Sequence, residues 1–143
     1  MENGGQLTAV DSSSQGIALI RTLFNHLSDE IQTTLRAVNA PAGVFLPRLN
    51  AETYDLIVVA GDPGNYDASF EQAPRLLKSH GVIVFTDMLA FESAESAGGV
   101  LNPANRDAKS VAMRALLETV ESDERFVTTL TPTGTGLLVA VKR

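Results

Sequence analysis

The fold class is decided by residues 54–60, Tyr54-Asp55-Leu56-Ile57-Val58-Val59-Ala60. This stretch is nearly all apolar, which is typical of a strand that is covered on both faces of a parallel sheet. A loop, Gly61-Asp62-Pro63-Gly64, follows it. After a helical segment, Val82-Ile83-Val84-Phe85 repeats the apolar pattern. Two such strands joined through a helix predict an α/β protein.

Strands and helices alternate on both sides of this stretch. The pattern predicts strands at 7–11, 33–38, 126–130 and 137–141, and helices at 14–28, 43–49, 68–78 and from Asn105 or Asp107 to 121. Asp67 is expected to cap the 68–78 helix and Gly81 to end it, while 90–104 is expected to be a surface loop. We therefore predict one domain, 1–143, with a doubly wound, mostly parallel sheet and a terminal antiparallel hairpin.

Composition and charge exclude several classes of protein. The chain has 143 residues, of which 44% are hydrophobic and 20% charged, which is too apolar for a disordered chain. Its net charge is −6 and its 11 basic residues are scattered, so we expect no nucleic-acid partner. No apolar run approaches the roughly 20 residues that span a bilayer, so no membrane partner is expected. The absence of cysteine fits a cytoplasmic protein and excludes thiolate chemistry.

Four segments, taken in order, resemble one enzyme family. Residues 54–66 are similar to the Tyr-Asp-Leu-Ile-Phe-Val-Asp-Ala-Asp-Lys-x-Asn-Tyr segment of the caffeoyl-CoA and catechol O-methyltransferases, a class I family dependent on S-adenosylmethionine. The other three are Phe45-Leu46-Pro47-Arg48-Leu49, Leu76-Leu77-Lys78-Ser79-His80-Gly81-Val82-Ile83-Val84 and Pro132-Thr133-Gly134-Thr135-Gly136-Leu137. The resemblance implies a Rossmann-like fold and methyl transfer to a hydroxyl of a small molecule, whose identity the sequence does not give.

The resemblance also implies a set of cofactor-binding residues. Asp11 ends the first strand, where the family carries the acidic residue that binds the ribose, and a carboxylate can accept from both hydroxyls of a diol. Asp11 could instead only start the turn before the helix, and dinucleotide enzymes use the same residue type. Pro41 stands where the family has an adenine-contacting Asp, and Asn39 is a substitute for it. The candidate set is Asp11, Ser12, Asn39, Asp62 and Tyr66, with Asn65 and Asp87 nearby.

The metal and the base of the family are not matched. The family binds a divalent cation through an Asp at the position of Ala60 and an Asp-Asn pair at Thr86-Asp87. Hard cations prefer carboxylates, and only Asp62 and Asp87 remain as candidates, either of which could simply cap a loop. A divalent metal is therefore not expected. Pro63 replaces the family's Lys base, so no catalytic residue is assigned.

Neither histidine is expected to replace the missing base. His80 precedes the 82–85 strand at its amino end, whereas sites in open α/β sheets form at the carboxyl ends. His80 is therefore expected in an exposed turn, and His26 on the surface of a helix.

The glycine-rich loop that normally holds the cofactor is also missing, since Gly4-Gly5 does not lie between a strand and a helix. The leading hypothesis is an O-methyltransferase homologue. The alternative is a non-catalytic or truncated relic that acts as an interaction or dimerisation module, and a nicotinamide-binding fragment is a third possibility. Strands 7–11 and 54–60 each expect a parallel neighbour, so we expect an upstream segment or a homo-oligomer to cover their edges.

Overall fold

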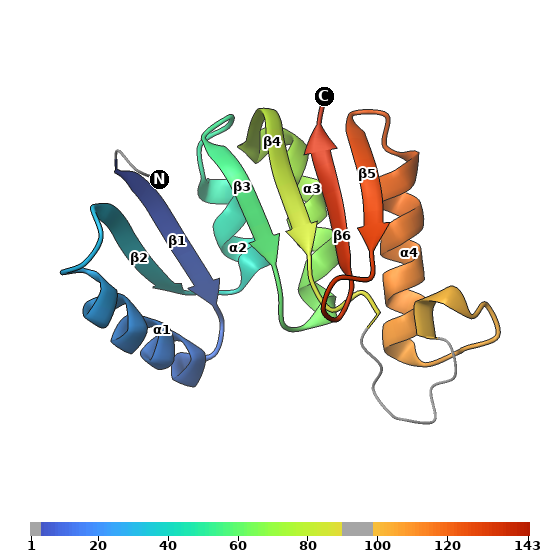
Figure 1. Ribbon diagram of the computed structural model, residues 1–143, viewed down its shortest axis with the longest axis horizontal. Helices are drawn as coiled ribbons and strands as arrows, with labels where there is room; N and C mark the ends of the chain where they lie inside the picture. The colour runs from blue at the N-terminus through green and yellow to red at the C-terminus, as the bar shows by residue number, and fades with distance from the viewer. Residues whose placement is uncertain (1–3, 90–98) are drawn as a thin grey trace. The chain divides into compact units, whose positions relative to one another are not determined.

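The computed structural model describes residues 4–89 and 99–143, and Figure 1 shows their course. The chain divides into two compact units, Met1–Arg48 and Leu49–Arg143, which we call the amino-terminal and the carboxyl-terminal unit. Each unit has its own sheet. No helix within the described ranges is both long and apolar enough to cross a membrane.

The amino-terminal unit is a β-α-β unit followed by a short helix. Strands β1 (Gly5–Asp11) and β2 (Thr33–Asn39) are parallel and joined through helix α1 (Ser14–Leu27). The predicted strands and the 14–28 helix are confirmed. The predicted 43–49 helix is present as α2 (Ala42–Phe45) and the 3₁₀ turn η1 (Leu46–Arg48).

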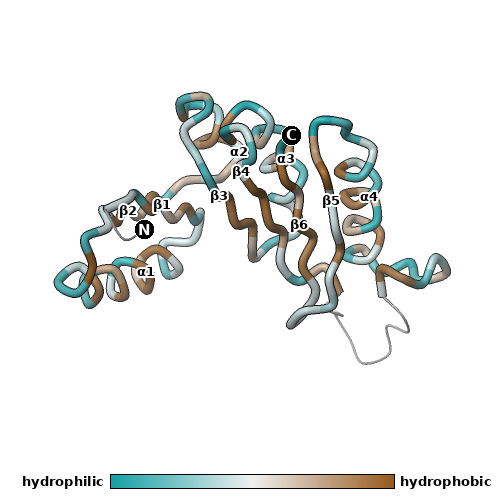
Figure 2. The backbone as a smooth tube through the Cα atoms, turned by 45° about the horizontal axis from the view of Figure 1, so that its top comes forward, coloured by the Kyte–Doolittle hydropathy of each residue, from teal (hydrophilic) through white to brown (hydrophobic). Residues whose placement is uncertain are grey.

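The carboxyl-terminal unit contains a four-stranded sheet in the order β3-β4-β6-β5. Strands β3 (Tyr54–Val59) and β4 (Leu77–Phe85) are parallel, and β6 (Leu137–Lys142) lies antiparallel between β4 and β5 (Phe126–Thr131). Figure 2 shows that β3, β4 and β6 are largely hydrophobic. The predicted fold class, parallel strands followed by a terminal antiparallel hairpin, is confirmed.

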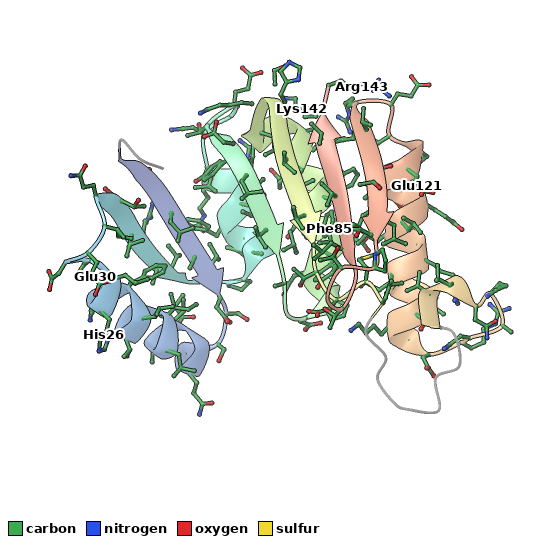
Figure 3. All side chains as sticks on the ribbon, in the orientation of Figure 1. His26, Glu30, Phe85, Glu121, Lys142 and Arg143 are labelled. Carbon is green, nitrogen blue, oxygen red and sulfur yellow. The ribbon has the colours of Figure 1, made fainter. Side chains whose placement is uncertain are left out.

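One face of this sheet carries the core. Helices α3 (Tyr66–Leu76) and α4 (Ala108–Ser122), with the 3₁₀ turns η2 (Pro63–Asn65) and η3 (Gly99–Leu101), lie on the same side of the sheet (Figure 1). Phe85 is fully buried between them, whereas Lys142 lies at the opposite end of the sheet (Figure 3). The other buried core residues that the two helices contribute are Tyr66, Phe70, Ala73, Met113, Leu116 and Val120.

The boundaries around α3 differ from the prediction. The helix begins at Tyr66, so Asn65 and not Asp67 is its N-cap residue, and it ends at Leu76, well before Gly81. Residues 77–81 belong to β4, where the pairing with β3 shifts register. Glycine is needed there because a Cβ on Gly81 would lie 2.9 Å from the carbonyl oxygen of Lys78. Gly81 therefore permits a tight irregularity in a strand and is not a helix stop.

Two further predictions concern the sheet and the long loop. The sequence predicts one sheet, but within residues 4–89 and 99–143 β1 pairs with β2 alone and β3 with β4 alone, so two sheets form. The prediction that 1–143 is a single domain stays a prediction. Of the predicted loop at 90–104, residues 90–98 lie outside the described residues, and 99–101 form η3. The Arg114 guanidinium holds this turn by donating to the carbonyls of Asn102, at 2.8 Å, and Asn105.

Candidate functional site

In the amino-terminal unit, three of the predicted site residues lie together at the carboxyl ends of two parallel strands. Asp11 ends β1 and is paired in register with Asn39, which ends β2. Ser12 follows Asp11 directly and leads into α1, whose N-cap is Ser13. Strand carboxyl ends followed by a helix amino end form the usual binding edge of an α/β sheet.

The carboxylate of Asp11 is divided between two tasks. Its Oδ1 accepts a 2.7 Å hydrogen bond from the backbone N–H of Ser13, which fixes the turn into α1. Within the described residues its Oδ2 accepts no hydrogen bond. The two alternatives for Asp11 are therefore compatible, because one oxygen makes the turn and the other remains available to a ligand.

Gly16 leaves room for that second oxygen. A Cβ on Gly16 would lie 2.5 Å from Oδ2 of Asp11, which is shorter than any real contact. The backbone N–H of Gly16 is itself bound by the Ser13 hydroxyl at 3.2 Å, so the first turn of α1 lies close against the carboxylate. Sequence reasoning missed Gly16. Its signal was a glycine five residues after the acidic residue, inside a helix that disfavours glycine.

The Asn39 amide connects the two strands to the helix. Its polar atoms are satisfied when the nitrogen donates to the carbonyls of Asp11 and Ser12, each at 3.1 Å, and the oxygen accepts from the Ser14 hydroxyl at 3.3 Å. Asn39 is exposed, as are Ser12 and Ser14. Asn39 therefore holds the backbone that presents the Asp11 carboxylate. Carboxylate, amide and hydroxyl groups side by side suit a ligand with a vicinal diol, such as a ribose.

The carboxyl-terminal unit contains the remaining predicted residues. Asp62 follows β3, and its Oδ1 accepts from the backbone N–H of Gly64 at 2.9 Å, which makes it the cap of η2. Tyr66 is only 1% exposed, and its hydroxyl donates to the carbonyl of Thr86 at 2.9 Å. The Tyr66 side chain thus fixes the end of β4 from inside the core, and its role in cofactor binding stays a prediction. Burial raises the pKa of Tyr66.

Asp87, just beyond β4, is held in an unusual conformation. Its φ is +58°, in the left-handed region that few residues other than glycine adopt at low cost. Its Oδ1 accepts from the hydroxyl of Thr135 at 2.5 Å and its Oδ2 from the hydroxyl of Thr86 at 3.1 Å. The bond from Thr135 and, second, the bond from Thr86 hold the pKa of Asp87 below its ordinary value, and the positive charge of Lys109 contributes.

Backbone contacts connect this strand end to the β5–β6 hairpin. The N–H groups of Met88 and Leu89 donate to the carbonyls of Gly136 and Thr135, at 3.1 and 2.8 Å. A Cβ on Gly136 would lie 2.6 Å from Leu89, so glycine is required for this approach. In the sequence, Thr135 is only one residue of the hairpin motif at 132–137. Its contact with Asp87 could not be read from that motif, because the two residues are 48 positions apart.

The donor set at this edge does not fit a divalent metal. Both oxygens of Asp87 already accept from threonine hydroxyls, and Asp62 caps a turn. In the part of the chain that the structure describes, no three His, Cys, Asp or Glu side chains gather into a group that could hold a cation. The side chain of Ala60 has no ligating atom.

Each unit contains one histidine, and both histidines are exposed. His80 is exposed, has a φ of +64° and belongs to the irregular start of β4 rather than to a loop before the strand. His26 lies in the last turn of α1, where its Nδ1 is 2.7 Å from the carbonyl oxygen of Thr22. Both are therefore surface residues, as the sequence predicts.

Comparisons with known proteins agree on the family. The chain is 32% identical over 142 residues to a protein of Mycobacterium avium (strain 104) provisionally named an O-methyltransferase, covering 99% of this chain and 61% of that protein. The chain thus spans about 60% of the length of the curated relatives that it matches.

Solved structures show the same fold. A protein of Corynebacterium glutamicum superposes with a TM-score of 0.81 at 24% identity, covering 96% of this chain and 60% of that one. An O-methyltransferase from Bacillus cereus, solved in complex with S-adenosylhomocysteine, gives 0.76 at 18% identity, covering 96% and 63%. The model of the O-methyltransferase family matches residues 1–143. Because that match spans the whole sequence, the chain belongs to the O-methyltransferase family.

Proposed function

We propose that this chain is the larger part of an S-adenosylmethionine-dependent O-methyltransferase that methylates a hydroxyl of a small molecule. The observation that carries the proposal is the Asp11 carboxylate, which keeps Oδ2 open at the carboxyl end of β1. Membership of the family favours this function over the alternative of an interaction module. Family membership also argues against a nicotinamide-binding fragment, and Asp11 is the one feature that would support such a fragment.

Each predicted residue receives a defined part in this proposal. Asp11 binds the ribose hydroxyls, while Asn39 and Ser12 hold the strand ends around it. Asp62 and Tyr66 shape the second strand end, Asp62 by capping η2 and Tyr66 by fixing the carbonyl of Thr86. When bound, S-adenosylmethionine would supply a methyl group on a sulfonium sulfur for transfer to an acceptor oxygen. Alignment of the two reactants is the main contribution that a protein makes to such a transfer.

Cytoplasmic location and self-association are further parts of the proposal. A chain without cysteine needs no oxidising compartment, which supports the cytoplasm. Leu19 and Leu23 lie one turn apart on α1 and are 73% and 56% exposed, which supports contact with a second copy. Light scattering at several concentrations measures the mass, and an L19E variant that stays monomeric would support this contact.

The ribose role of Asp11 can be tested by calorimetric titration of S-adenosylhomocysteine. The titration uses residues 1–143 and a chimera in which residues 1–143 replace the aligned segment of the Mycobacterium avium relative. We expect weak or no binding to residues 1–143, because the glycine-rich loop is missing. In the chimera we expect binding that D11A weakens at least about tenfold, since a hydrogen bond to a charged group is lost.

Asp55→Ala is the matched control. Asp55 is another strand carboxylate, but its side chain is 81% exposed and pairs with Lys78 on the surface. D55A should leave the affinity of the chimera unchanged. Equal affinity of the D11A chimera and the unaltered chimera would refute the role of Asp11. Micromolar binding of S-adenosylhomocysteine to residues 1–143 would refute the prediction that the glycine-rich loop is needed for binding.

A further inference from the structure

A groove of about 350 Å³ lies in the carboxyl-terminal unit between α3 and α4. Its α3 wall consists of Asp67, Phe70 and Glu71, and its α4 wall of Ala115 and Thr119. Residues four apart on a helix lie one above the other on the same side, so the two small side chains of α4 leave a continuous gap where larger ones would fill the helix contact. None of the candidate cofactor-binding residues lines this groove.

An aromatic ring forms the apolar part of the groove. Phe70 is 5% exposed, and its ring centroid lies 5.3 Å from that of Phe126 and 6.3 Å from that of Phe85. These contacts hold the ring in the core of the unit. The exposed edge of Phe70, with the methyl group of Ala115 opposite, therefore offers a ligand a preformed hydrocarbon surface.

Two carboxylates lie beside this surface without partners. Asp67 and Glu71 are both exposed and are one turn apart on α3. Within the described residues, no hydrogen bond or ion pair involves either side chain. Like charges at this spacing destabilise a helix. A cation bound between Asp67 and Glu71 would relieve that repulsion.

The remaining polar groups of the groove leave only acceptors for a ligand. Arg125 is its one basic residue, and its Nε and Nη2 donate to Asp123 at 2.9 and 2.7 Å, which balances its charge. The hydroxyl of Thr119 donates its proton to the carbonyl of Ala115 at 2.9 Å, so its oxygen can only accept from a ligand. The groove therefore suits a ligand that carries donors and positive charge.

The neighbouring sequence strengthens the negative potential around the groove. Residues 115–124 include Glu118, Glu121, Asp123 and Glu124 and no basic residue. The whole chain has a net charge of −6. A surface of one sign raises the local concentration of ligands of the opposite sign. Cations are therefore the ligands that this side of the unit attracts.

The chemistry of the groove favours an organic cation over a metal ion. In the part of the chain that the structure describes, no three acidic or histidine side chains gather as a divalent ion requires. An ammonium group has three donors and no acceptor, and its hydrocarbon stem can lie on apolar surface. We propose that the groove binds a linear aliphatic polyamine, with ammonium groups at Asp67 and Glu71 and the carbon chain between Phe70 and Ala115.

Calorimetric titration of spermidine into residues 1–143 at physiological salt tests this proposal. We expect saturable binding with a dissociation constant of about 0.1–1 mM, because exposed ion pairs are individually weak. E71Q should weaken binding at least about threefold, and D67N/E71Q at least about tenfold. Magnesium chloride, titrated in the same way, should give no saturable heat up to millimolar concentration.

Two control variants separate the groove from general charge. Glu121→Gln removes the same charge from α4, but Glu121 does not line the groove (Figure 3). A position two residues from Thr119 lies on the other side of the helix, so E121Q should leave the affinity unchanged. A115L fills the groove without a change of charge and should weaken binding at least about threefold, since leucine is nearly as good a helix former as alanine. A18L, at an exposed alanine of α1, is its steric control and should have no effect.

Equal weakening by E71Q and E121Q would overturn the proposal, because spermidine would then respond to net charge alone. Unchanged affinity of A115L, the absence of saturable heat, or equally tight binding of magnesium would overturn it as well. If circular dichroism shows that A115L does not fold, backbone amide shifts of the unaltered chain decide. Spermidine should shift amides within 67–71 and 115–125, and shifts centred elsewhere would contradict the proposed site.

The titration with spermidine uses neither S-adenosylhomocysteine nor an assay of methyl transfer. Asp67 and Glu71 belong to α3, whereas the proposed ribose contact of Asp11 belongs to the amino-terminal unit. D11A should therefore leave spermidine binding unchanged. Failure of the polyamine proposal and failure of the proposed function can be told apart.

Discussion

The hydroxyl of Thr135, in the hairpin between β5 and β6, donates a 2.5 Å hydrogen bond to Oδ1 of Asp87, just beyond β4. The two residues are 48 positions apart, so the bond is tertiary. It holds Asp87 at a φ of +58° and ties the hairpin to the end of a parallel strand. These contacts lie at the carboxyl end of β4, and α/β enzymes bind their ligands at the carboxyl ends of strands.

Replacing Thr135 should weaken the contact between the β5–β6 hairpin and the end of β4. T135V removes the hydroxyl and leaves Asp87 with the bond from Thr86 alone, so we expect the free energy of unfolding to fall by about 1 kcal/mol. Urea denaturation measures the change. Thr129→Val is the control, because Thr129 is exposed on the same sheet and should change stability by less than about 0.5 kcal/mol. Equal effects of the two variants would contradict the role of this bond.

The bond also predicts a pH dependence. The folded state lowers the pKa of Asp87 below its ordinary value of 3.8, chiefly through the bond from Thr135. A lowered pKa stabilises the fold above the ordinary value, and this contribution is lost as the pH falls through the folded-state value. The difference in unfolding free energy between the unaltered chain and D87N should therefore shrink between pH 6 and pH 2. A difference that grows on acidification would contradict this assignment.

Gly16 and Asp11 should be coupled. Alanine at position 16 adds helix propensity worth up to about 1 kcal/mol, but its Cβ would displace the Asp11 carboxylate. We therefore expect G16A to stabilise the D11A variant and to give little or no gain in the unaltered chain. A double-mutant cycle from urea denaturation gives the coupling energy, expected at about 1 kcal/mol because the bond from Ser13 is lost. Additive effects would show that the carboxylate moves away at no cost.

Divalent metal should not bind tightly to residues 1–143. Asp62 and Asp87 are engaged in hydrogen bonds, and the Ala60 side chain offers no oxygen, so too few carboxylates are available for a hard cation. Calorimetric titration with magnesium or calcium chloride should give no saturable heat up to millimolar concentration. A crystal structure with a fully coordinated ion between Asp62 and Asp87 would prove this wrong.

The sequence by itself determined the order and type of the elements. The apolar runs at 54–60 and 82–85 predict parallel strands because strands inside a parallel sheet are covered on both faces, and both strands are present. Asp11 and Asn39 could be placed at strand ends because each follows the last apolar residue of its strand. The observed register pairs the two residues. The short turn at Pro132-Thr133-Gly134-Thr135-Gly136 likewise required the antiparallel pair of β5 and β6.

Only the tertiary structure decided what these residues touch. Tyr66 reads as a site residue in the sequence, but packing against Phe85 places its ring in the core, with centroids 5.6 Å apart. Thr135 reads as a turn residue, but the hairpin folds back and brings its hydroxyl to Asp87. Sequence patterns report local propensity and burial, whereas hydrogen bonds between residues far apart depend on how strands are ordered in a sheet. The alignment of Leu56 with Val82, Val141 and Val127 follows the same rule, because only strand register brings these residues into one row.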